Sequence, residues 1–226
     1  HGFGKGVSLN RCLARGLRRE AFDMVRLKSD LHVHTADDPF DPIGYSAEML
    51  IDVAAEAGIE VLAIACHGAV AYGERLAEYA RRRGVLLVPA AETLVERKHV
   101  LILNPDPEHL RAKTFAALRQ VGRRRAALIA PHPFYPVGVS LGAKLLENID
   151  LFDAIEYCFF YSVGVNFNRR AVQAARTHKL PLVGTTDTHR MPYTPSTFSW
   201  LEAEPTVDGI IEAIRSGRVA VETRPR

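Results

Sequence analysis

The chain has few cysteines, no long apolar run and little net charge. Only three cysteines occur among 226 residues, and no two form a Cys-X-X-Cys pair, so a disulfide framework is excluded and reduced thiols of a cytoplasmic protein are expected. No stretch approaches the ~18–20 apolar residues that a membrane-spanning helix needs. A net charge of +3 is too small to indicate a nucleic-acid partner by itself. We therefore expect a protein without a membrane segment.

Length and composition suit one substantial core, since 47% of the residues are hydrophobic. The first methionine, Met24, stands directly before the first apolar run, so we interpret residues 1–23 as an N-terminal extension or a cloning remnant. Residues 24–226 are expected to form a single domain.

Apolar runs alternate with segments of helical periodicity. The predicted strands are Leu27–Val33, Ile59–Ala65, Val85–Ala91, His99–Leu103, Ala126–Ala130, Ala154–Tyr157 and Pro181–Thr185, with a short last strand at Arg218–Glu222. The clearest predicted helices are Ser46–Ile59, Tyr72–Gly84, Val165–Lys179 and Val207–Gly217. Short continuous apolar strands that alternate with helices are typical of a parallel sheet buried on both faces. The pattern predicts a small α/β barrel, with a doubly wound open sheet as the alternative.

Side chains that can bind metals gather at the ends of these strands. His32 and His34 end the first strand, and two residues spaced i and i+2 on a strand point to the same face. Asp187 and His189 repeat this spacing after the seventh strand. Four further residues also lie at strand ends: His67, Glu92, His99 (which begins its strand) and His132.

A lone histidine at a strand end is more often structural than a ligand, but six of the nine histidines lie at such positions. The carboxyl ends of parallel strands are where α/β proteins build their sites. Burying so many ionisable groups without a cation would be costly. Mixed histidine and carboxylate ligands suit zinc, manganese or iron, and about nine ligands suit two or three ions.

Six motifs together resemble the PHP (polymerase and histidinol phosphatase) superfamily of metal-dependent phosphoesterases. They are "DLHVHT" (Asp30–Thr35), "AIACHG" (Ala63–Gly68), "PAAE" (Pro89–Glu92), "KHVLIL" (Lys98–Leu103), "APHP" (Ala130–Pro133) and "TTDTH" (Thr185–His189). They occur in the order found in that superfamily, from Lys28 to Arg190, and as a set they are specific.

The resemblance implies a distorted (β/α)7 TIM-like barrel with a di- or trinuclear metal centre. It implies one metal held by His32, His34, Glu92 and Asp187, which would activate water. Glu92 would also bridge to a second metal, which His99 and His132 would complete. The resemblance implies a third metal held by His67, His189 and a residue after the first motif.

The last of these ligands is the least certain from the motif spacing. Asp37 and Asp38 come slightly early and Asp41 slightly late, and we choose Asp38. Cys66 replaces the usual Asp or Asn before His67, and we interpret it as a small hydrophobic residue. The chain also lacks the large inserted domain of those relatives that act on nucleic-acid ends or nucleotides.

The predicted function is hydrolysis of phosphoesters by metal-activated hydroxide. A small phosphorylated substrate is expected, with Lys98 and Arg190 as its binding residues. Nucleic acid is a weaker alternative, because three arginine clusters are at least as well explained as solvated helix ends and no aromatic stacking platform is evident. Two other functions remain open: an amidohydrolase-type metal hydrolase, and a non-catalytic regulatory or structural module. The sequence leaves the oligomeric state undetermined.

Overall fold

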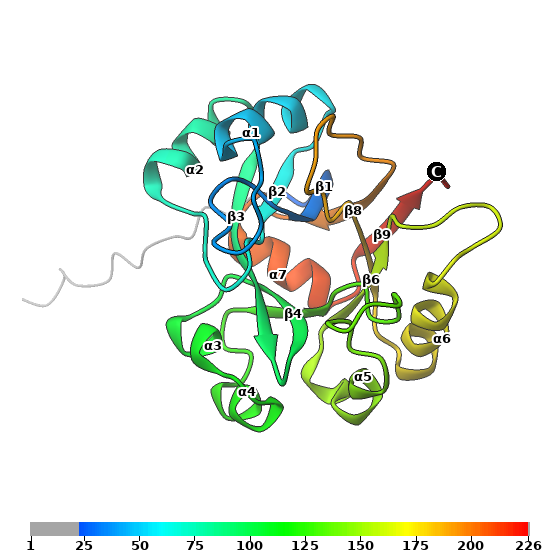
Figure 1. Ribbon diagram of the computed structural model, residues 1–226. Helices are drawn as coiled ribbons and strands as arrows, with labels where there is room; N and C mark the ends of the chain where they lie inside the picture. Colours follow the sequence, from blue (N-terminus) through cyan, green and yellow to red (C-terminus); the bar gives the residue numbers. More distant parts are fainter. Residues whose placement is uncertain (1–22, 226) are drawn as a thin grey trace, which may run out of the picture.

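The computed structural model describes residues 23–225, and these form a mixed α/β domain built on one nearly closed, barrel-like sheet (Figure 1). The predicted N-terminal extension, apart from Asp23, lies outside the described residues. The distorted barrel predicted from the motifs is confirmed. No described helix is long and apolar enough to cross a membrane.

The sheet has nine strands in the order β7-β6-β5-β4-β3-β2-β1-β8-β9. Their bounds are β1 Val25–Val33, β2 Val61–Ile64, β3 Leu86–Val95, β4 Lys98–Leu103, β5 Ala127–Ala130, β6 Ala154–Cys158, β7 Leu182–Thr185, β8 Thr197–Ala203 and β9 Val219–Thr223. The helices are α1 Ala47–Glu56, α2 Glu74–Arg81, α3 Pro107–Arg111, α4 Phe115–Val121, α5 Ala143–Glu147, α6 Asn168–His178 and α7 Val207–Arg215, with a 3-10 turn at Ile149–Leu151.

The prediction of a wholly parallel sheet is wrong at two places. Strand β4 runs antiparallel to both β3 and β5, because β3 turns directly into β4 through Glu96 and Arg97, which both have positive φ. Strand β8 was not predicted, and it pairs antiparallel with β1 and β9. Its polar residues at alternate positions resemble a loop when the sequence is read alone.

The barrel closes at one end between β1 and the segment after β7. The amide of Asp187 donates to the carbonyl of His32 (2.8 Å), and the amide of His34 donates to the carbonyl of Thr188 (3.0 Å). At the other end, β8 and β9 stand between β1 and β7 and hold the sheet open. The closed end is therefore the one that carries His32 and His34 of the first motif and Asp187 and His189 after β7.

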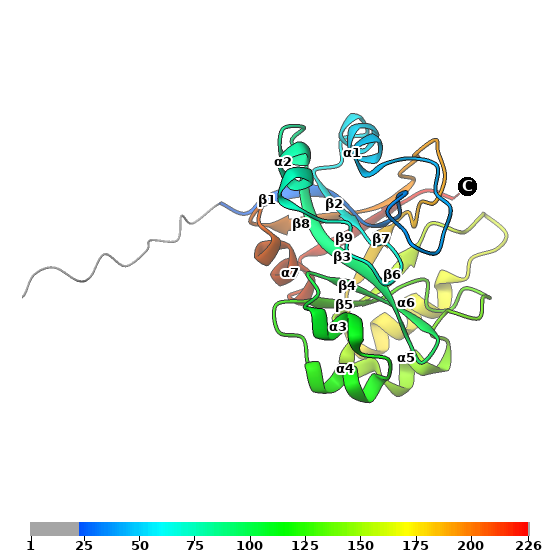
Figure 2. The same cartoon turned by 60° about the vertical axis from the view of Figure 1, so that its left-hand side comes forward.

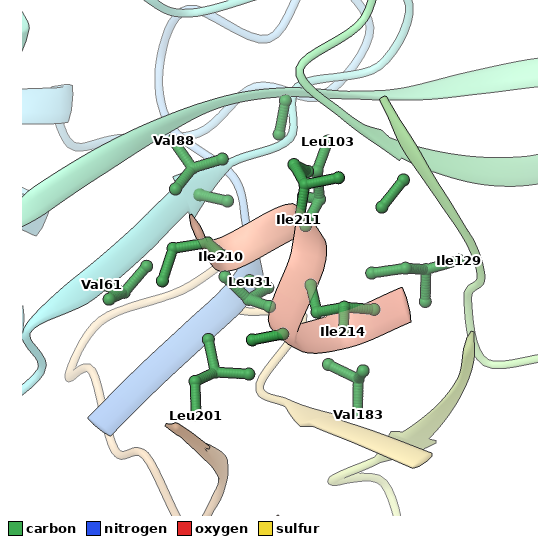
Figure 3. Close-up of a cluster of buried hydrophobic side chains, with 14 of the residues drawn as sticks. Leu31, Val61, Val88, Leu103, Ile129, Val183, Leu201, Ile210, Ile211 and Ile214 are labelled. Carbon is green, nitrogen blue, oxygen red and sulfur yellow. The ribbon is translucent and has the colours of Figure 1, made fainter. Parts of the chain in front are cut away.

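Helix α7 fills the interior of the barrel at the open end (Figure 3). Ile210, Ile211 and Ile214 of this helix are buried among inward-facing side chains of the surrounding strands, including Leu31 and Val183. The amphipathic pattern of α7 predicted a helix, and only the structure shows that its apolar face packs inside the sheet.

The remaining helices cover the outside of the sheet, with α1 and α2 on one side and α3 to α6 on the other (Figure 2). Helix α1 begins where it was predicted, since the Ser46 hydroxyl accepts from the amide of Met49 (3.2 Å). The chain leaves α1 through Gly58 at φ 74°, a conformation that glycine adopts without strain. The closed end of the barrel is not covered by these helices and is open to a site.

Candidate metal centre

The strand-end residues predicted to bind metals meet at the closed end of the barrel. His32 and Glu92 lie within β1 and β3. The other members come shortly after the ends of β1, β2, β5 and β7: His34, His67, His132, Asp187 and His189. His99 stands at the beginning of β4. Because β4 runs antiparallel to β3 and β5, this beginning lies beside the carboxyl ends of those two strands.

A β-bulge in β1 sets the direction of the first two imidazoles. The pairing of β1 with β2 shifts register between Asp30 and Val33. Leu31 packs in the barrel interior, whereas Val33 packs against the outer helices. A bulge allows two successive residues to face the same side, so Leu31 fills the core and His32 and His34 still face the site.

The central group consists of His32, His34, Glu92 and Asp187. The Nε2 atoms of the two histidines lie 3.1 Å apart. Asp187 Oδ1 lies 3.5 Å from His32 Nε2 and 3.4 Å from His34 Nε2, and Glu92 Oε2 lies 3.5 Å from His32 Nε2. Four possible ligand atoms therefore surround one point, as expected for the first metal.

Glu92 connects this group to a second one. Its Oε1 atom lies 2.8 Å from His99 Nδ1 and 3.0 Å from His132 Nε2. Its Oε2 atom, which faces the central group, also lies 3.0 Å from His67 Nε2. The side chain is buried, and its two oxygens face different imidazoles, which is the placement that a bridging carboxylate requires.

A third group forms from His34, His67 and His189, whose ligand atoms lie within 4.8 Å of one another. The His34 and His189 rings stack with centroids 4.1 Å apart, and the His34 and His67 rings with centroids 4.6 Å apart. Asp41 stands beside this group, with Oδ2 3.2 Å from His189 Nε2 and 3.7 Å from His67 Nδ1.

Asp38, the ligand chosen from the sequence, lies behind the imidazoles. Its Oδ2 atom accepts from Nδ1 of His34 (3.0 Å) and of His67 (2.8 Å), while its Oδ1 atom accepts the amides of Phe40 (2.9 Å) and Asp41 (3.1 Å). A carboxylate that accepts from Nδ1 fixes the tautomer that leaves Nε2 free. In this position Asp38 orients two histidines, and Asp41 is the acidic residue that faces the pocket.

Two further buried carboxylates brace the site. Glu156 on β6 accepts from His32 Nδ1 (2.8 Å), from the Thr185 hydroxyl and from the amide of His132. Asp30 accepts from the Thr186 hydroxyl and amide, at 2.6 and 3.1 Å, and so fastens the segment after β7 to β1. Glu156 therefore braces His32 and the backbone of His132 from behind the site.

Opposite charges hold the site together electrostatically. Burial alone would lower the pKa of His32, but the charges of Asp187, Glu156 and Glu92 raise it well above its usual value. The pKa of His132 rises to about 9, because its contacts with Glu92 outweigh burial. Burial also raises the pKa of Asp30 to about 6 despite its hydrogen bonds. In the metal-free protein, His32 and His132 therefore favour the protonated form, whose charge offsets that of the neighbouring carboxylates.

Several features fit a bound cation better than a closed hydrogen-bond network. Asp187 Oδ1 and His99 Nδ1 are buried, yet neither has a hydrogen-bond partner of good geometry. His132 and Asp187 adopt positive φ values of 28° and 48°. Unsatisfied polar atoms and backbone strain are costly, and such features cluster at functional sites. The set of imidazole and carboxylate donors therefore fits divalent metals of the zinc, manganese or iron type.

The histidines and carboxylates of the candidate metal centre open into a pocket of about 210 Å³. Its polar floor is formed by metal-site residues, and its rim by Tyr135, Val137, Val139 and Phe160, which sequence reasoning did not identify. The predicted substrate-binding residue Lys98 lines the groove beside this pocket, whereas Arg190 is exposed and lines neither. Cys66 is buried with the apolar residues under α1 and α2, as expected for a small hydrophobic residue.

No family model matches the chain. An uncharacterized protein of Methanocaldococcus jannaschii is 27% identical over 146 residues, which are 57% of this chain and 82% of the relative.

Three solved structures have a similar fold. PsfC from Pseudomonas syringae superposes with a TM-score of 0.67 at 19% identity, covering 89% of this chain and 93% of PsfC. A candidate metal-dependent phosphoesterase from Bifidobacterium adolescentis gives a TM-score of 0.55 at 16% identity, covering 74% of this chain and 90% of that one. The lesion-specific endonuclease Q of Pyrococcus furiosus gives 0.59 at 14% identity, covering 87% of this chain and 58% of that longer one. The chain therefore shares the distorted barrel fold of these proteins, and the predicted resemblance is confirmed at the level of the fold.

Proposed function

We propose that this chain is a metal-dependent hydrolase that acts on phosphoesters, with two or three divalent cations held by the histidines and carboxylates of the candidate metal centre. The observation that carries the proposal is Glu92, whose buried carboxylate touches imidazoles of all three groups. The likeness to a candidate metal-dependent phosphoesterase and to an endonuclease supports hydrolase chemistry in general.

The proposed ligands follow the three groups of atoms. The first cation would lie between His32, His34, Glu92 and Asp187. The other two sets are Glu92, His99 and His132 for the second cation, and His67, His189 and Asp41 for the third. We assign Asp41 rather than Asp38 to the third set, because Asp38 already accepts five hydrogen bonds behind the imidazoles.

Bound divalent cations would polarise a phosphoryl oxygen and lower the pKa of water near the reacting phosphorus. The protein's own contribution is to orient His32, His34 and His67, whose Nδ1 atoms donate to Glu156 and Asp38 so that their Nε2 atoms face the proposed cations. The apolar rim of the pocket limits access of bulk water and strengthens these electrostatic interactions. A small phosphorylated molecule would fit the 210 Å³ pocket, with its uncharged part against the rim.

The test combines metal analysis with a substrate panel. Purified protein should carry two or three equivalents of metal, and with added Mn²⁺ or Zn²⁺ it should hydrolyse p-nitrophenyl phosphate or bis(p-nitrophenyl) phosphate. His34→Ala should lose metal and most of this activity, because His34 is a proposed ligand of the first cation and its ring stacks on His67 and His189 of the third set.

The matched control is His178→Ala, which removes an exposed histidine at the end of α6, away from the centre. This variant should keep both metal and activity. Unchanged phosphoesterase activity in His34→Ala would refute the assigned site. Turnover of amides or lactones without phosphoesters would favour an amidohydrolase instead, and metal-free, inactive wild-type protein would favour a non-catalytic module.

A further inference from the structure

A groove of about 640 Å³ continues from the metal pocket. The two share Tyr135 and Val137 as a common wall. Beyond this wall the groove is lined by the basic side chains of Lys98, Arg169 and Arg170.

These three cations have no acidic partner. Among residues 23–225, no carboxylate lies within 4.0 Å of Lys98, Arg169 or Arg170, although Lys98 Nζ donates to the carbonyl of Gly138 (2.7 Å) and Arg170 stacks over Phe134. The arginine clusters seen in the sequence differ in this respect. Each arginine of the 81–83 and 123–125 clusters forms an ion pair, in agreement with solvated helix ends.

Arg169 and Arg170 also stand where a cation is unfavourable. Both belong to the first turn of α6, which contains no acidic residue. The helix macrodipole places partial positive charge at this end, so it repels the guanidinium groups and attracts an anion. An anion bound between the two side chains would relieve this repulsion, and the helix end and the arginines would bind it together.

Aromatic rings separate the basic groove from the metal pocket. The Tyr135 ring lies 5.4 Å from the centroids of both Phe160 and Phe167. Phe160 and Phe167 are 36% and 39% exposed, an unusual state for phenylalanine that indicates a binding surface. This cluster is the stacking platform that could not be seen in the sequence.

We propose that the groove is a second subsite of the active site and that the substrate is a short single-stranded oligonucleotide. The inference rests on the proposed phosphoesterase function. The phosphoester at the metal pocket would be hydrolysed, with water adding to phosphorus, one phosphorus–oxygen bond breaking, and the leaving oxygen taking a proton. The adjoining base would stack on Tyr135, Phe160 and Phe167, and the next phosphate would bind Lys98, Arg169 and Arg170.

The aromatic cluster favours a single strand over a duplex. Sequence-tolerant binding of single strands combines a basic groove with rings on which bases stack. In a duplex the bases stack on one another and their faces are not available to a protein ring. A mononucleotide would fill the metal pocket and leave the three cations unused.

The experiment compares a tetranucleotide, a mononucleotide and bis(p-nitrophenyl) phosphate as substrates of the metal-loaded protein. The test variant is Arg169→Ala/Arg170→Ala, and its matched control is Arg176→Ala/Lys179→Ala, which removes two exposed cations from the far end of the same helix. Wild type should have a higher kcat/KM for the tetranucleotide than for the mononucleotide.

In the test variant, the ratio of kcat/KM for the tetranucleotide to that for bis(p-nitrophenyl) phosphate should fall by on the order of tenfold or more, whereas the control should keep the wild-type ratio. Because the two arginines bind one proposed phosphate, their removal should also make the logarithmic salt dependence of KM shallower by up to about 0.7. Phe167→Leu, which keeps an apolar side chain but removes the ring, should weaken tetranucleotide binding without changing the salt dependence.

Two failures are distinguishable. If no phosphoester is hydrolysed, including bis(p-nitrophenyl) phosphate, the proposed function itself is overturned. If bis(p-nitrophenyl) phosphate is hydrolysed but the test variant keeps the wild-type substrate ratio and salt dependence, the second subsite alone is overturned. Equal turnover of mononucleotide and tetranucleotide by wild type would overturn it too.

Discussion

Replacing Glu156 by glutamine tests whether a residue that touches no substrate controls the metal centre. Glu156 is fully buried, and both of its oxygens accept hydrogen bonds: one from His32 Nδ1 and the Thr185 hydroxyl, the other from the amide of His132. A glutamine has the same shape but only one accepting oxygen. Its amide nitrogen must therefore face either the His132 amide or the two other donors.

The size of the effect follows from these contacts. At least one buried donor is left without an acceptor, which costs about 1–3 kcal/mol of folding free energy. His32 also loses part of the negative charge that holds its Nδ1 proton, so its Nε2 atom is a poorer and less well oriented ligand. Changes of this kind behind a metal-bound histidine typically weaken metal affinity by roughly 10–100-fold.

Two measurements on one preparation check this prediction. Competition titration with a chelator gives the affinity for Mn²⁺, and urea unfolding of the metal-free protein gives the loss of stability. Glu212→Gln, at an exposed position of α7, should change neither quantity. Wild-type metal affinity in Glu156→Gln, with the stability loss present, would refute the orienting role of this carboxylate.

Three further predictions concern protonation and packing. In the metal-free protein, contacts with Glu92 outweigh burial and raise the pKa of His67 and of His132 to about 9. Metal must therefore displace protons, and the affinity for Mn²⁺ should rise from pH 7 to pH 9. A flat pH profile of the affinity would contradict this. Ile214→Ala, which opens a cavity where α7 fills the barrel, should lower the free energy of unfolding by about 2–5 kcal/mol in a urea titration; a loss under about 1 kcal/mol would place the side chain outside the core. Gly184→Ala would bring a Cβ atom to 2.7 Å from the carbonyl oxygen of Phe198. This overpacking should lower the free energy of unfolding by about 1–3 kcal/mol. Thermal stability equal to that of the wild type would argue against the tight contact of β7 with β8.

Most of the fold could be predicted from the sequence because local patterns determine most of its elements. Strands β1 to β7 coincide with continuous apolar runs, and helix α1 follows a serine cap and ends before Gly58. Strand β8 escaped prediction because Thr197, Ser199 and Glu202 interrupt its apolar residues, so it is not a continuous apolar run even though most of its residues are buried. Its pairing with β1 joins residues about 170 positions apart, a contact that no short window of sequence contains.

The sequence predicted which residues gather at the site, but not the role of each one there. Periodicity on a strand indicated that His32 and His34 share a face, and the structure brings their Nε2 atoms to 3.1 Å. Spacing could not separate Asp38 from Asp41, since both follow the first motif in a turn. Only the folded loop shows that Asp38 accepts from the histidine Nδ1 atoms while Asp41 faces the pocket.

The sequence by itself determined which side chains are available and roughly where most strands lie, because hydrophobic periodicity and turn residues act over a few positions. The tertiary structure decided how these pieces face one another. The bulge in β1 turns both Leu31 and the two histidines inward, and the antiparallel direction of β4 brings His99 to the site. Helix α7 fills the barrel at its open end. These features depend on contacts between distant segments, whose energies are set by packing in three dimensions rather than by any local pattern.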